Sequence, residues 1–397
     1  PFPSKSLAGV GVIFYVMLAL RQRLQHRGWF SASDISYPNL ADLLDLVALG
    51  TVADVVPLDH NNRRLVAQGV ARIRAGKSHP GIQALLKVAG RDPSRLTSLD
   101  LAFAIAPRLN AAGRLADMSL GIECLISKNQ SECDRAAVAL DDLNRERREI
   151  ESEMKIQAIE LVDKMGLSDG PALRSGICLV NEDWHQGVVG IIAARIKERY
   201  HRPVIAFAPA DGKTLKGSGR SIPGVHLRDS LDAIAARHPG LLSKFGGHAM
   251  AAGLSLVAGD FDEFSEVFDA EIRRQVGAAG INPEITTDGE LGEEDFNLDL
   301  AGQLSEAGPW GQLFPEPLFD GSFLIIDKRT VGETHVRLQL QPLGKTTTIP
   351  AIAFGAIDES WVRGAEAIHA TYRLAVNEYR GNRSLQLIVS HARSIEA

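Results

Sequence analysis

Apolar residues recur at helical spacing through the first 125 residues of the chain. The pattern predicts helices over Leu7–Leu24, Leu40–Val52, Asn62–Arg74, Pro80–Ala89 and Asp100–Leu109. The glycine-containing segment from Asn110 to Arg114 predicts a turn. Since no strand is evident in this part of the chain, we expect the helical remainder of an α/β domain whose sheet comes from other sequence.

One long helix is expected over residues 129–166. A single apolar stripe runs along it at three- and four-residue steps, and its members are Leu143, Ile150, Met154, Ala158, Leu161 and Met165. The other faces carry dense charge of both signs, which is typical of a solvated surface. A helix this long with so narrow an apolar stripe is expected to connect two domains. Gly166 and the Gly170-Pro171 pair are expected to end the helix.

Residues 171–265 have an α/β pattern. The short β-branched segments Gly176–Val180 and Pro203–Ala208 flank a helical segment, Val188–Tyr200. This order predicts a β-α-β unit with parallel strands. The basic, glycine-rich residues 214–221 are interpreted as a loop, and residues 229–236 as a helix.

Residues 266–282 predict another helix, and an acidic stretch follows it. Five short β segments come next: Leu318–Ile326, His335–Gln341, Thr347–Phe354, Thr371–Tyr379 and Leu385–Val389. They predict a small barrel of the OB type, although other small β folds have the same strand count. The expected divisions of the chain are 1–128, 129–170, 171–265 and 266–397.

Composition excludes several classes of protein. The 397 residues are 45% hydrophobic and 23% charged, so a folded protein is expected rather than a disordered one. Three cysteines without a CxxC pair exclude a disulfide scaffold and a cysteine zinc ribbon, and they fit a reducing, cytoplasmic setting. The longest apolar segment, Leu7 to Leu20, is too short to span a membrane. The net charge of −6 means that any nucleic-acid affinity must come from a local patch.

A carboxylate stands in an apolar context at Asp54, within ALGTVADVVPL. Burying an unpaired carboxylate is costly. Asp54 is therefore either an oxygen ligand for Mg²⁺ or Mn²⁺, or a helix cap or ion-paired residue.

Three further segments combine glycine with groups that suit phosphate. RLNAAGR supplies Arg108, Asn110 and Arg114, which either bind phosphate or end a helix at the surface. In WHQGVVGI, His185 precedes a helix start at which backbone N–H groups could hold an anion, unless His185 is simply a cap. The loop KGSGRS would add Lys216, Arg220 and Ser221 as phosphate contacts.

The segment GGHAMAAG contains His248 after two glycines. A lone histidine is more often a satisfied structural residue than a catalytic one. The paired glycines nevertheless predict an unusual backbone conformation at this position.

Together and in this order, these five segments resemble the RecJ single-strand-specific 5′→3′ exonucleases of the DHH phosphoesterase family. The resemblance extends over the whole chain. It implies an α/β multidomain protein with the helical remainder of a DHH core, a long linker helix, an α/β DHH-associated domain and a C-terminal OB-like barrel.

The resemblance also implies a chemistry, namely two-metal phosphodiester hydrolysis with Mn²⁺ or Mg²⁺. Asp54 is similar to the family's last metal-ligand aspartate, and His248 belongs to the family's Gly-Gly-His motif. Arg114, Arg220 and Ser221 resemble parts of the pocket for DNA phosphates. The family's DxDxDG and Asp-His-His motifs are absent, so the chain resembles the C-terminal part of such an enzyme, with most metal ligands missing.

The sequence thus predicts a single-strand DNA exonuclease for repair and recombination. The alternatives are an inactive single-strand-binding module and a DHH phosphodiesterase acting on short oligonucleotides. Aromatic residues of the β region are candidates for stacking bases, or for barrel core: Phe319, Phe323, Phe354, Tyr372 and Tyr379. We expect a monomer without membrane contact whose partners are single-stranded DNA and, by family resemblance, a single-strand-binding protein or a helicase.

Overall fold

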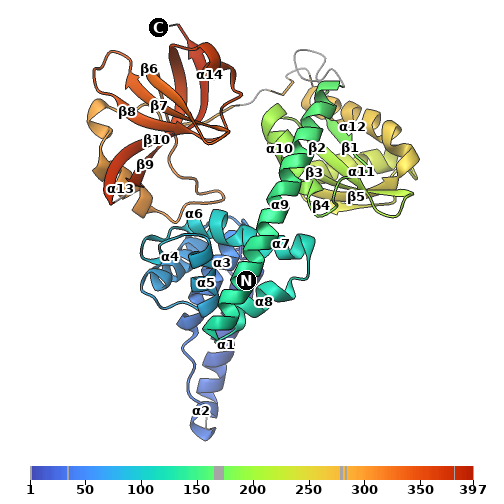
Figure 1. The fold of residues 1–397 in the computed structure, drawn as a ribbon. Helices are drawn as coiled ribbons and strands as arrows, with labels where there is room; N and C mark the ends of the chain where they lie inside the picture. Colours follow the sequence, from blue (N-terminus) through green and yellow to red (C-terminus); the bar gives the residue numbers. More distant parts are fainter. Residues whose placement is uncertain are drawn as a thin grey trace. The chain divides into compact units, whose positions relative to one another are not determined.

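The computed structural model describes residues 2–33, 35–164, 174–277, 280–281, 284–379 and 381–396 (Figure 1). The chain forms two compact units. The first comprises Pro1–Pro107, Glu123–Ala137 and Ile285–Ala397, and the second comprises Arg108–Ile122 and Val138–Glu284. The first unit is therefore discontinuous in sequence.

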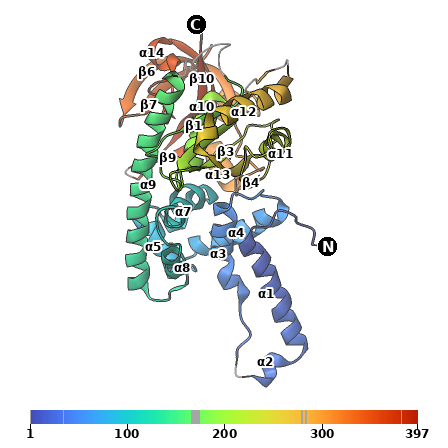
Figure 2. The ribbon, with the colours of Figure 1, turned by 90° about the vertical axis from the view of Figure 1, so that its right-hand side faces the viewer.

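The N-terminal part of the first unit is helical, as predicted. Its helices are α1 (Gly9–His26), α2 (Trp29–Ala32), α3 (Leu44–Ala53), α4 (His60–Arg74), α5 (Pro80–Val88) and α6 (Ser98–Asp100). Figure 2 shows α1 alongside α3, with α2 at the far end of α1. Phe14, Val47 and Leu65 form a buried cluster between these helices. The carboxylate of Asp59 caps α4 by accepting a hydrogen bond from the Asn62 N–H at 2.8 Å.

The turn predicted from Asn110 to Arg114 is wrong, because these residues are helical. A π-helical turn, Leu101–Ile105, leads directly into α7 (Ala106–Leu115), and α8 (Ser119–Ile126) follows. A glycine inside a helix costs only about 1 kcal/mol relative to alanine. Full burial of Ala111 and Ala112 offsets that cost.

Helix α9 (Gln130–Lys164) confirms the long helix, and Met165 and the predicted glycine stop lie outside the described residues. Its buried positions differ from the predicted stripe. Asn144 and Arg147 are buried, whereas Leu143 is only half-buried. The interpretation of the charged faces as wholly solvated is therefore wrong at Arg147.

The second unit contains a five-stranded sheet in the order β1-β2-β3-β5-β4. Its strands are β1 (Ile177–Val180), β2 (Val204–Pro209), β3 (Thr214–Arg220), β4 (Lys244–Gly247) and β5 (Ala251–Val257). Strands β1 and β2 are parallel and are joined by α10 (Val189–Tyr200), as predicted. The other pairs are antiparallel.

The segment interpreted as a glycine-rich loop is strand β3. Its residues alternate between the two faces of the sheet. A Cβ atom on Gly217 would lie 2.5 Å from the ring of Phe207, and one on Gly219 would lie 2.7 Å from Leu227. Neighbouring side chains thus fill the space above these glycines, which leaves Lys216, Ser218 and Arg220 on the opposite face.

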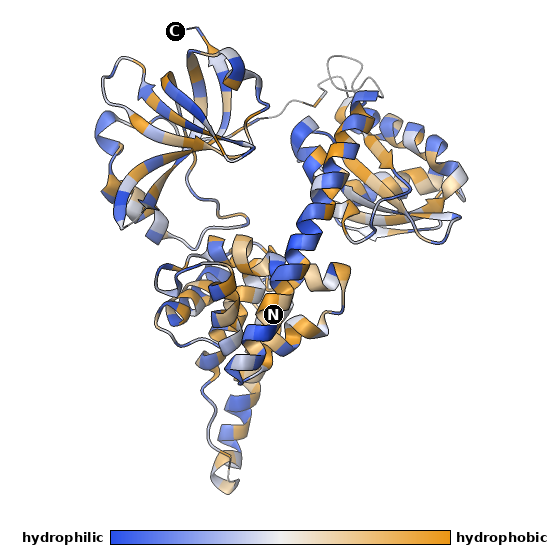
Figure 3. Ribbon diagram, in the orientation of Figure 1, coloured by the Kyte–Doolittle hydropathy of each residue, from blue (hydrophilic) through white to orange (hydrophobic). Residues whose placement is uncertain are grey.

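Helices cover both faces of this sheet (Figure 1). On one face α9 and α10 enclose a core that includes Met154, Ile192 and Ala206. On the other face lie α11 (Leu227–Arg237) and α12 (Phe261–Val276), whose buried residues include Phe264 and Phe268. The division expected between residues 265 and 266 therefore falls inside α12, a helix of the α/β domain. In Figure 3 strands β1 and β2 are coloured hydrophobic, as strands buried on both faces should be.

The C-terminal strands close into a barrel in the order β10-β8-β7-β6-β9, as the OB prediction requires. They are β6 (Phe319–Val331), β7 (His335–Pro342), β8 (Ile349–Ala353), β9 (Ala367–Tyr379) and β10 (Asn382–Ile395), with α13 (Leu298–Ala307) before them and α14 (Ser360–Gly364) after β8. Strand β10 pairs with β9 in antiparallel and with β8 in parallel orientation.

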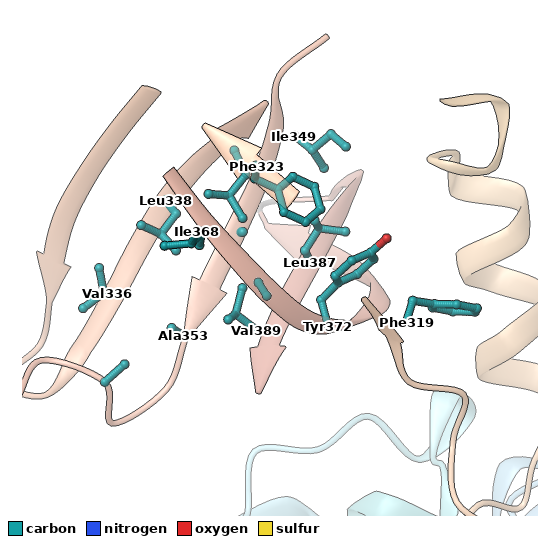
Figure 4. Packing of buried hydrophobic residues seen from close by; sticks show 14 of the residues in the cluster. Phe319, Phe323, Val336, Leu338, Ile349, Ala353, Ile368, Tyr372, Leu387 and Val389 are labelled. Atoms are coloured by element: carbon teal, nitrogen blue, oxygen red, sulfur yellow. The ribbon is translucent and has the colours of Figure 1, made fainter. Parts of the chain in front are cut away.

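Most of the candidate stacking aromatics are barrel core. Phe323 and Tyr372 point into the barrel and are 1% exposed, and Phe319 is also buried (Figure 4). The side chain of Tyr379 lies outside the described residues. Phe354 differs from them, because 60% of it is exposed.

Backbone and side-chain contacts join the barrel end of the first unit to its helical part. The Leu58 N–H donates to the Gln312 carbonyl at 2.7 Å, and the Ser98 hydroxyl donates to the Trp310 carbonyl at 2.9 Å. The Arg63 guanidinium lies 4.0 Å from the Phe314 ring centroid. Separately, no helix among the described residues is both long and apolar enough to cross a membrane.

Candidate nucleic-acid interface

Two arginines of the second unit, Arg114 and Arg220, approach each other. Arg114 lies near the end of α7, and Arg220 is the last residue of β3. Burial, and then the positive charge of Arg114, lower the pKa of Arg220. Among the described residues, neither guanidinium has a carboxylate within 4 Å. Two desolvated like charges are costly, and an anion bound between them would relieve that cost.

Arg114 is held in place through the loop before α10. Its Nη1 donates to the Gly187 carbonyl at 2.9 Å. A Cβ atom on Gly187 would lie 2.5 Å from the Arg114 carbonyl oxygen, so only glycine permits this approach. Burial, followed by repulsion from Arg147, lowers the pKa of Arg114.

Arg220 is anchored along its own strand. Its Nη1 donates to the Ser218 hydroxyl at 3.1 Å and to the Gly219 carbonyl at 2.8 Å. A Cβ atom on Gly190, in the first turn of α10, would lie 2.8 Å from the Ser218 Oγ and 2.9 Å from the Arg220 Nη2. The positive end of a helix therefore adds to the charge of Arg220.

A third arginine, Arg147 of α9, was not identified from the sequence. Its Nη1 donates to Glu151 at 2.7 Å and its Nη2 to Asn144 at 3.2 Å, while its Nε is buried without a partner among the described residues. Glu151 also accepts from Arg195 at 3.0 Å. The four-residue spacing of Arg147 and Glu151 signals a helical ion pair, but not its burial.

Arg108 is engaged differently from Arg114. Its Nε donates to the Asp141 carboxylate at 2.8 Å, and its Nη2 lies 2.7 Å from the same oxygen. Both side chains are largely buried. This geometry favours a role in fixing α7 against α9 over a phosphate contact. Asn110, on the same helix, is exposed.

The remaining predicted phosphate contacts separate into two groups. Lys216 is exposed and lies on the same face of β3 as Ser218 and Arg220. Ser221 is buried, and its hydroxyl donates to the Val225 carbonyl at 2.7 Å, which makes it part of a turn.

The two histidines lie in turns. His185 is exposed, and its Nδ1 accepts a hydrogen bond from the Gly187 N–H at 3.1 Å, within the turn before α10; the N-cap residue of that helix is Val188. His248 is also exposed and lies in the β4–β5 turn, where its N–H donates to the Ala251 carbonyl. Gly247 before it has φ +145°, so the expected unusual backbone is present.

Asp54 is the exposed C-cap residue of α3, which is the position that the helix-cap alternative describes. Within the described ranges no group of three or more histidines, cysteines, aspartates or glutamates could hold a metal ion. The described residues therefore do not form a complete metal site by themselves.

Two family profiles match the chain. The RecJ OB domain matches residues 287–391, and the DHHA1 domain matches residues 174–274. The single-stranded-DNA-specific exonuclease RecJ of Salmonella typhimurium is 52% identical over 389 residues, which are 98% of this chain and 67% of that protein. This chain belongs to the RecJ family.

Other RecJ proteins agree with this assignment. The Escherichia coli RecJ is 52% identical over 98% of this chain and 68% of its own length. The crystal structure of Thermus thermophilus RecJ in complex with Mg²⁺ matches with a TM-score of 0.77 at 27% identity. That match covers this whole chain but 57% of the Thermus chain, so the chain spans little more than half of the solved RecJ structure. A second Thermus RecJ structure is a complex with Mn²⁺.

Proposed function

We propose that this chain binds the backbone of single-stranded DNA within a RecJ exonuclease, and that Arg114 and Arg220 hold one phosphate of the strand. The observation that carries the proposal is the approach of two partly desolvated guanidinium groups, neither of which forms an ion pair with a described carboxylate. Guanidinium groups match the geometry of phosphate oxygens, and desolvation strengthens the attraction. Lys216 would add a solvated positive charge beside Arg220.

The hydrolysis proposed for the whole enzyme is the metal-dependent release of nucleotides in the 5′→3′ direction. Mg²⁺ and Mn²⁺ occur in the solved Thermus structures, and Asp54 is the residue of this chain proposed as an oxygen ligand. Since the described residues do not complete a metal site, we assign the chain's own residues to binding and positioning the strand. His248 stays a proposed catalytic residue on the basis of its motif alone.

Substitution of Arg220 tests the phosphate assignment. Binding of 3′-labelled oligothymidylate, with or without a 5′-phosphate, is measured by fluorescence anisotropy in EDTA. Removing one desolvated, charge-assisted contact predicts about a tenfold loss of affinity for R220Q and R114Q. R228Q is the matched control, because Arg228 lies on the same domain in an exposed ion pair with Asp232 at 3.5 Å.

Equal affinities of R220Q, R114Q and R228Q would contradict the proposal. A loss confined to the 5′-phosphorylated strand would identify the held group as the terminal phosphate. Nucleotide release from the same strand in Mn²⁺, compared with D54N, tests the proposed metal role of Asp54 independently of binding.

The finer assignments of partners and location are also proposals. We propose a monomer that acts in the cytoplasm and that cooperates with a single-strand-binding protein or a helicase. These assignments rest on the family resemblance and on a composition with few cysteines, and size-exclusion chromatography with light scattering tests the first of them.

A further inference from the structure

A cavity of about 440 Å³ lies within the first unit, at α4, α6 and the segment that joins α13 to the barrel. Its volume is in the range of small-molecule sites. The wall includes Ala67 and Ala71 from α4, and Pro309 and Trp310 from the joining segment. Methyl groups and an aromatic ring thus make much of the wall apolar. The residues proposed above to hold a phosphate belong to the other unit.

Several polar groups of this wall are already engaged within the protein. The hydroxyls of Thr97 and Ser98 and the indole N–H of Trp310 each donate a hydrogen bond, at 2.8–2.9 Å. The Nε of Arg74 donates to the Leu96 carbonyl at 2.7 Å. None of these donors needs a ligand to complete its hydrogen bonding.

Glu316 differs from these groups. Its side chain is 17% exposed, and among the described residues none donates a hydrogen bond to its carboxylate. The nearest described cation is Arg373, whose Nη1 lies 3.9 Å away, beyond hydrogen-bond distance. Burial raises the pKa of Glu316 in spite of that arginine. A carboxylate that is withdrawn from water without a donor is unfavourable, and a cation bound in the cavity would offset the cost.

The charged residues of the wall also favour a cation. They are the carboxylates of Glu306 and Glu316 and the guanidinium of Arg74, so two negative charges and one positive charge give −1. This charge disfavours a phosphate or a carboxylate as the ligand. Glu306 is exposed whereas Glu316 is largely buried, so the cavity offers one carboxylate at its mouth and one in its depth. The indole ring of Trp310 is a further favourable surface for an ammonium group.

We propose that this cavity is a binding site for an aliphatic polyamine. One ammonium group would bind Glu316, a second would lie beside Glu306, and the methylene chain between them would cover Ala67 and Ala71. Two carboxylates set in an apolar wall match a ligand whose charges are separated by methylene groups. The ligand would contact the helical part and the barrel part of the first unit at once, and would stabilise their association. The inference does not depend on the phosphate contacts proposed above.

Calorimetric titration of the whole chain with spermidine, without DNA and at physiological salt, tests the site. E316Q is expected to weaken binding about tenfold, because it removes a charge-assisted hydrogen bond that is shielded from water. E306Q should weaken binding about two- to threefold, since Glu306 is exposed and its charge is screened. D327N is the matched control and should change nothing, because Asp327 is an exposed carboxylate of the same barrel and does not line the cavity.

A further variant tests the cavity without changing its charge. A71M adds methylene groups at an exposed position of α4 that lines the cavity. Alanine and methionine both favour helix, so α4 should be retained, and thermal unfolding without ligand should match that of the unmodified chain. A71M should nevertheless bind spermidine more weakly. Butylamine, which has one ammonium group, should bind more weakly than putrescine, the diamine with the same number of carbons.

Spermidine should also slow hydrogen exchange in peptides of α4 and of residues 305–316, and not in peptides of β1–β5. Equal affinity of E316Q and the unmodified chain for spermidine would overturn the proposal, as would equal binding of butylamine and putrescine. Should E316Q unfold, equal affinity of A71M and the unmodified chain would overturn it instead. Displacement of spermidine by Mg²⁺ at equal charge concentration would show general attraction to an acidic chain, and would also overturn the proposal.

Discussion

The two arginine pairs of this chain differ in how they are supported. Arg114 and Arg220 are hydrogen-bonded to backbone carbonyls and a serine hydroxyl, and burial lowers the pKa of each. Arg329 and Arg337 lie opposite each other on an exposed sheet surface beside Phe354. The first arrangement suits one phosphate in a fixed position. The second leaves both guanidinium groups in water, where their charges are screened.

The largest expected effect separates the inside of the barrel from its outer surface. Phe323 is 1% exposed in the barrel core, so F323A should destabilise the barrel by about 3–5 kcal/mol. F354A, on the outside, should leave its stability unchanged. Hydrogen exchange of β6–β10 peptides, read by mass spectrometry, measures the stability of the barrel in both variants.

In the same F323A protein, peptides of β1–β5 should keep their protection, because they belong to the other unit. The phosphate contact of Arg220 should survive as well. Loss of protection in both sets of peptides would show that the two regions unfold together. The two arginine pairs could then not be treated as independent sites.

An effect confined to the α/β domain is expected at acid pH. Glu271 of α12 is buried and accepts hydrogen bonds from Arg274, Gln275 and Arg237. The Arg274 hydrogen bond is the main cause that lowers the pKa of Glu271 to about 2. A lowered pKa in the folded state stabilises the protein above the unfolded-state pKa of about 4.3, and this contribution is lost as the pH falls toward about 2.

E271Q should therefore lower the stability of the α/β domain at neutral pH by about 1–2 kcal/mol, since the two arginines are half exposed and partly screened. The difference from the unmodified chain should shrink as the pH falls below 4.3. Urea unfolding at several pH values, followed by hydrogen exchange in α12 peptides, gives the result. A constant difference across this pH window would exclude the proposed role of the charge.

The smallest expected effect is in the salt dependence of DNA binding. Each phosphate contact on a single strand contributes a slope of about 0.7 to the plot of log affinity against log salt concentration. R220Q should reduce the slope by about that amount, and R228Q should leave it unchanged because Arg228 is paired with Asp232. An unchanged slope for R220Q would mean that Arg220 makes no phosphate contact.

Local pattern predicted most of the helices and strands, because apolar spacing reports which face of an element is buried. The prediction from local pattern failed where tertiary packing outweighed the local preference of glycine for turns and loops. Gly113 suggested a turn, but the buried Ala111 and Ala112 keep α7 helical. Gly217 and Gly219 suggested a loop, but Phe207 and Leu227 fill the space that their side chains would take.

The candidate site was predicted in part. Motif resemblance identified Arg114 and Arg220, which the structure brings together. It could not distinguish them from Arg108, because the partner of Arg108 is Asp141, 33 residues away. Arg147 was hidden among other charges of α9, and only the fold shows that it is buried. The burial of Ser221 and the exposure of Asp54 likewise follow from the fold and have no signal in the local sequence.

The discontinuous first unit has a consequence for synthesis of the chain. Its helical part ends at Ala137, and its barrel part begins at Ile285. At a ribosomal rate of about 5–20 residues per second, roughly 7–30 seconds separate the emergence of the two parts. The surfaces of Leu58, Ser98 and Arg63 that later meet the Gln312 segment are uncovered during this delay. The nascent helical part should therefore be the chaperone-dependent part of the chain, and the α/β domain should complete its folding before it.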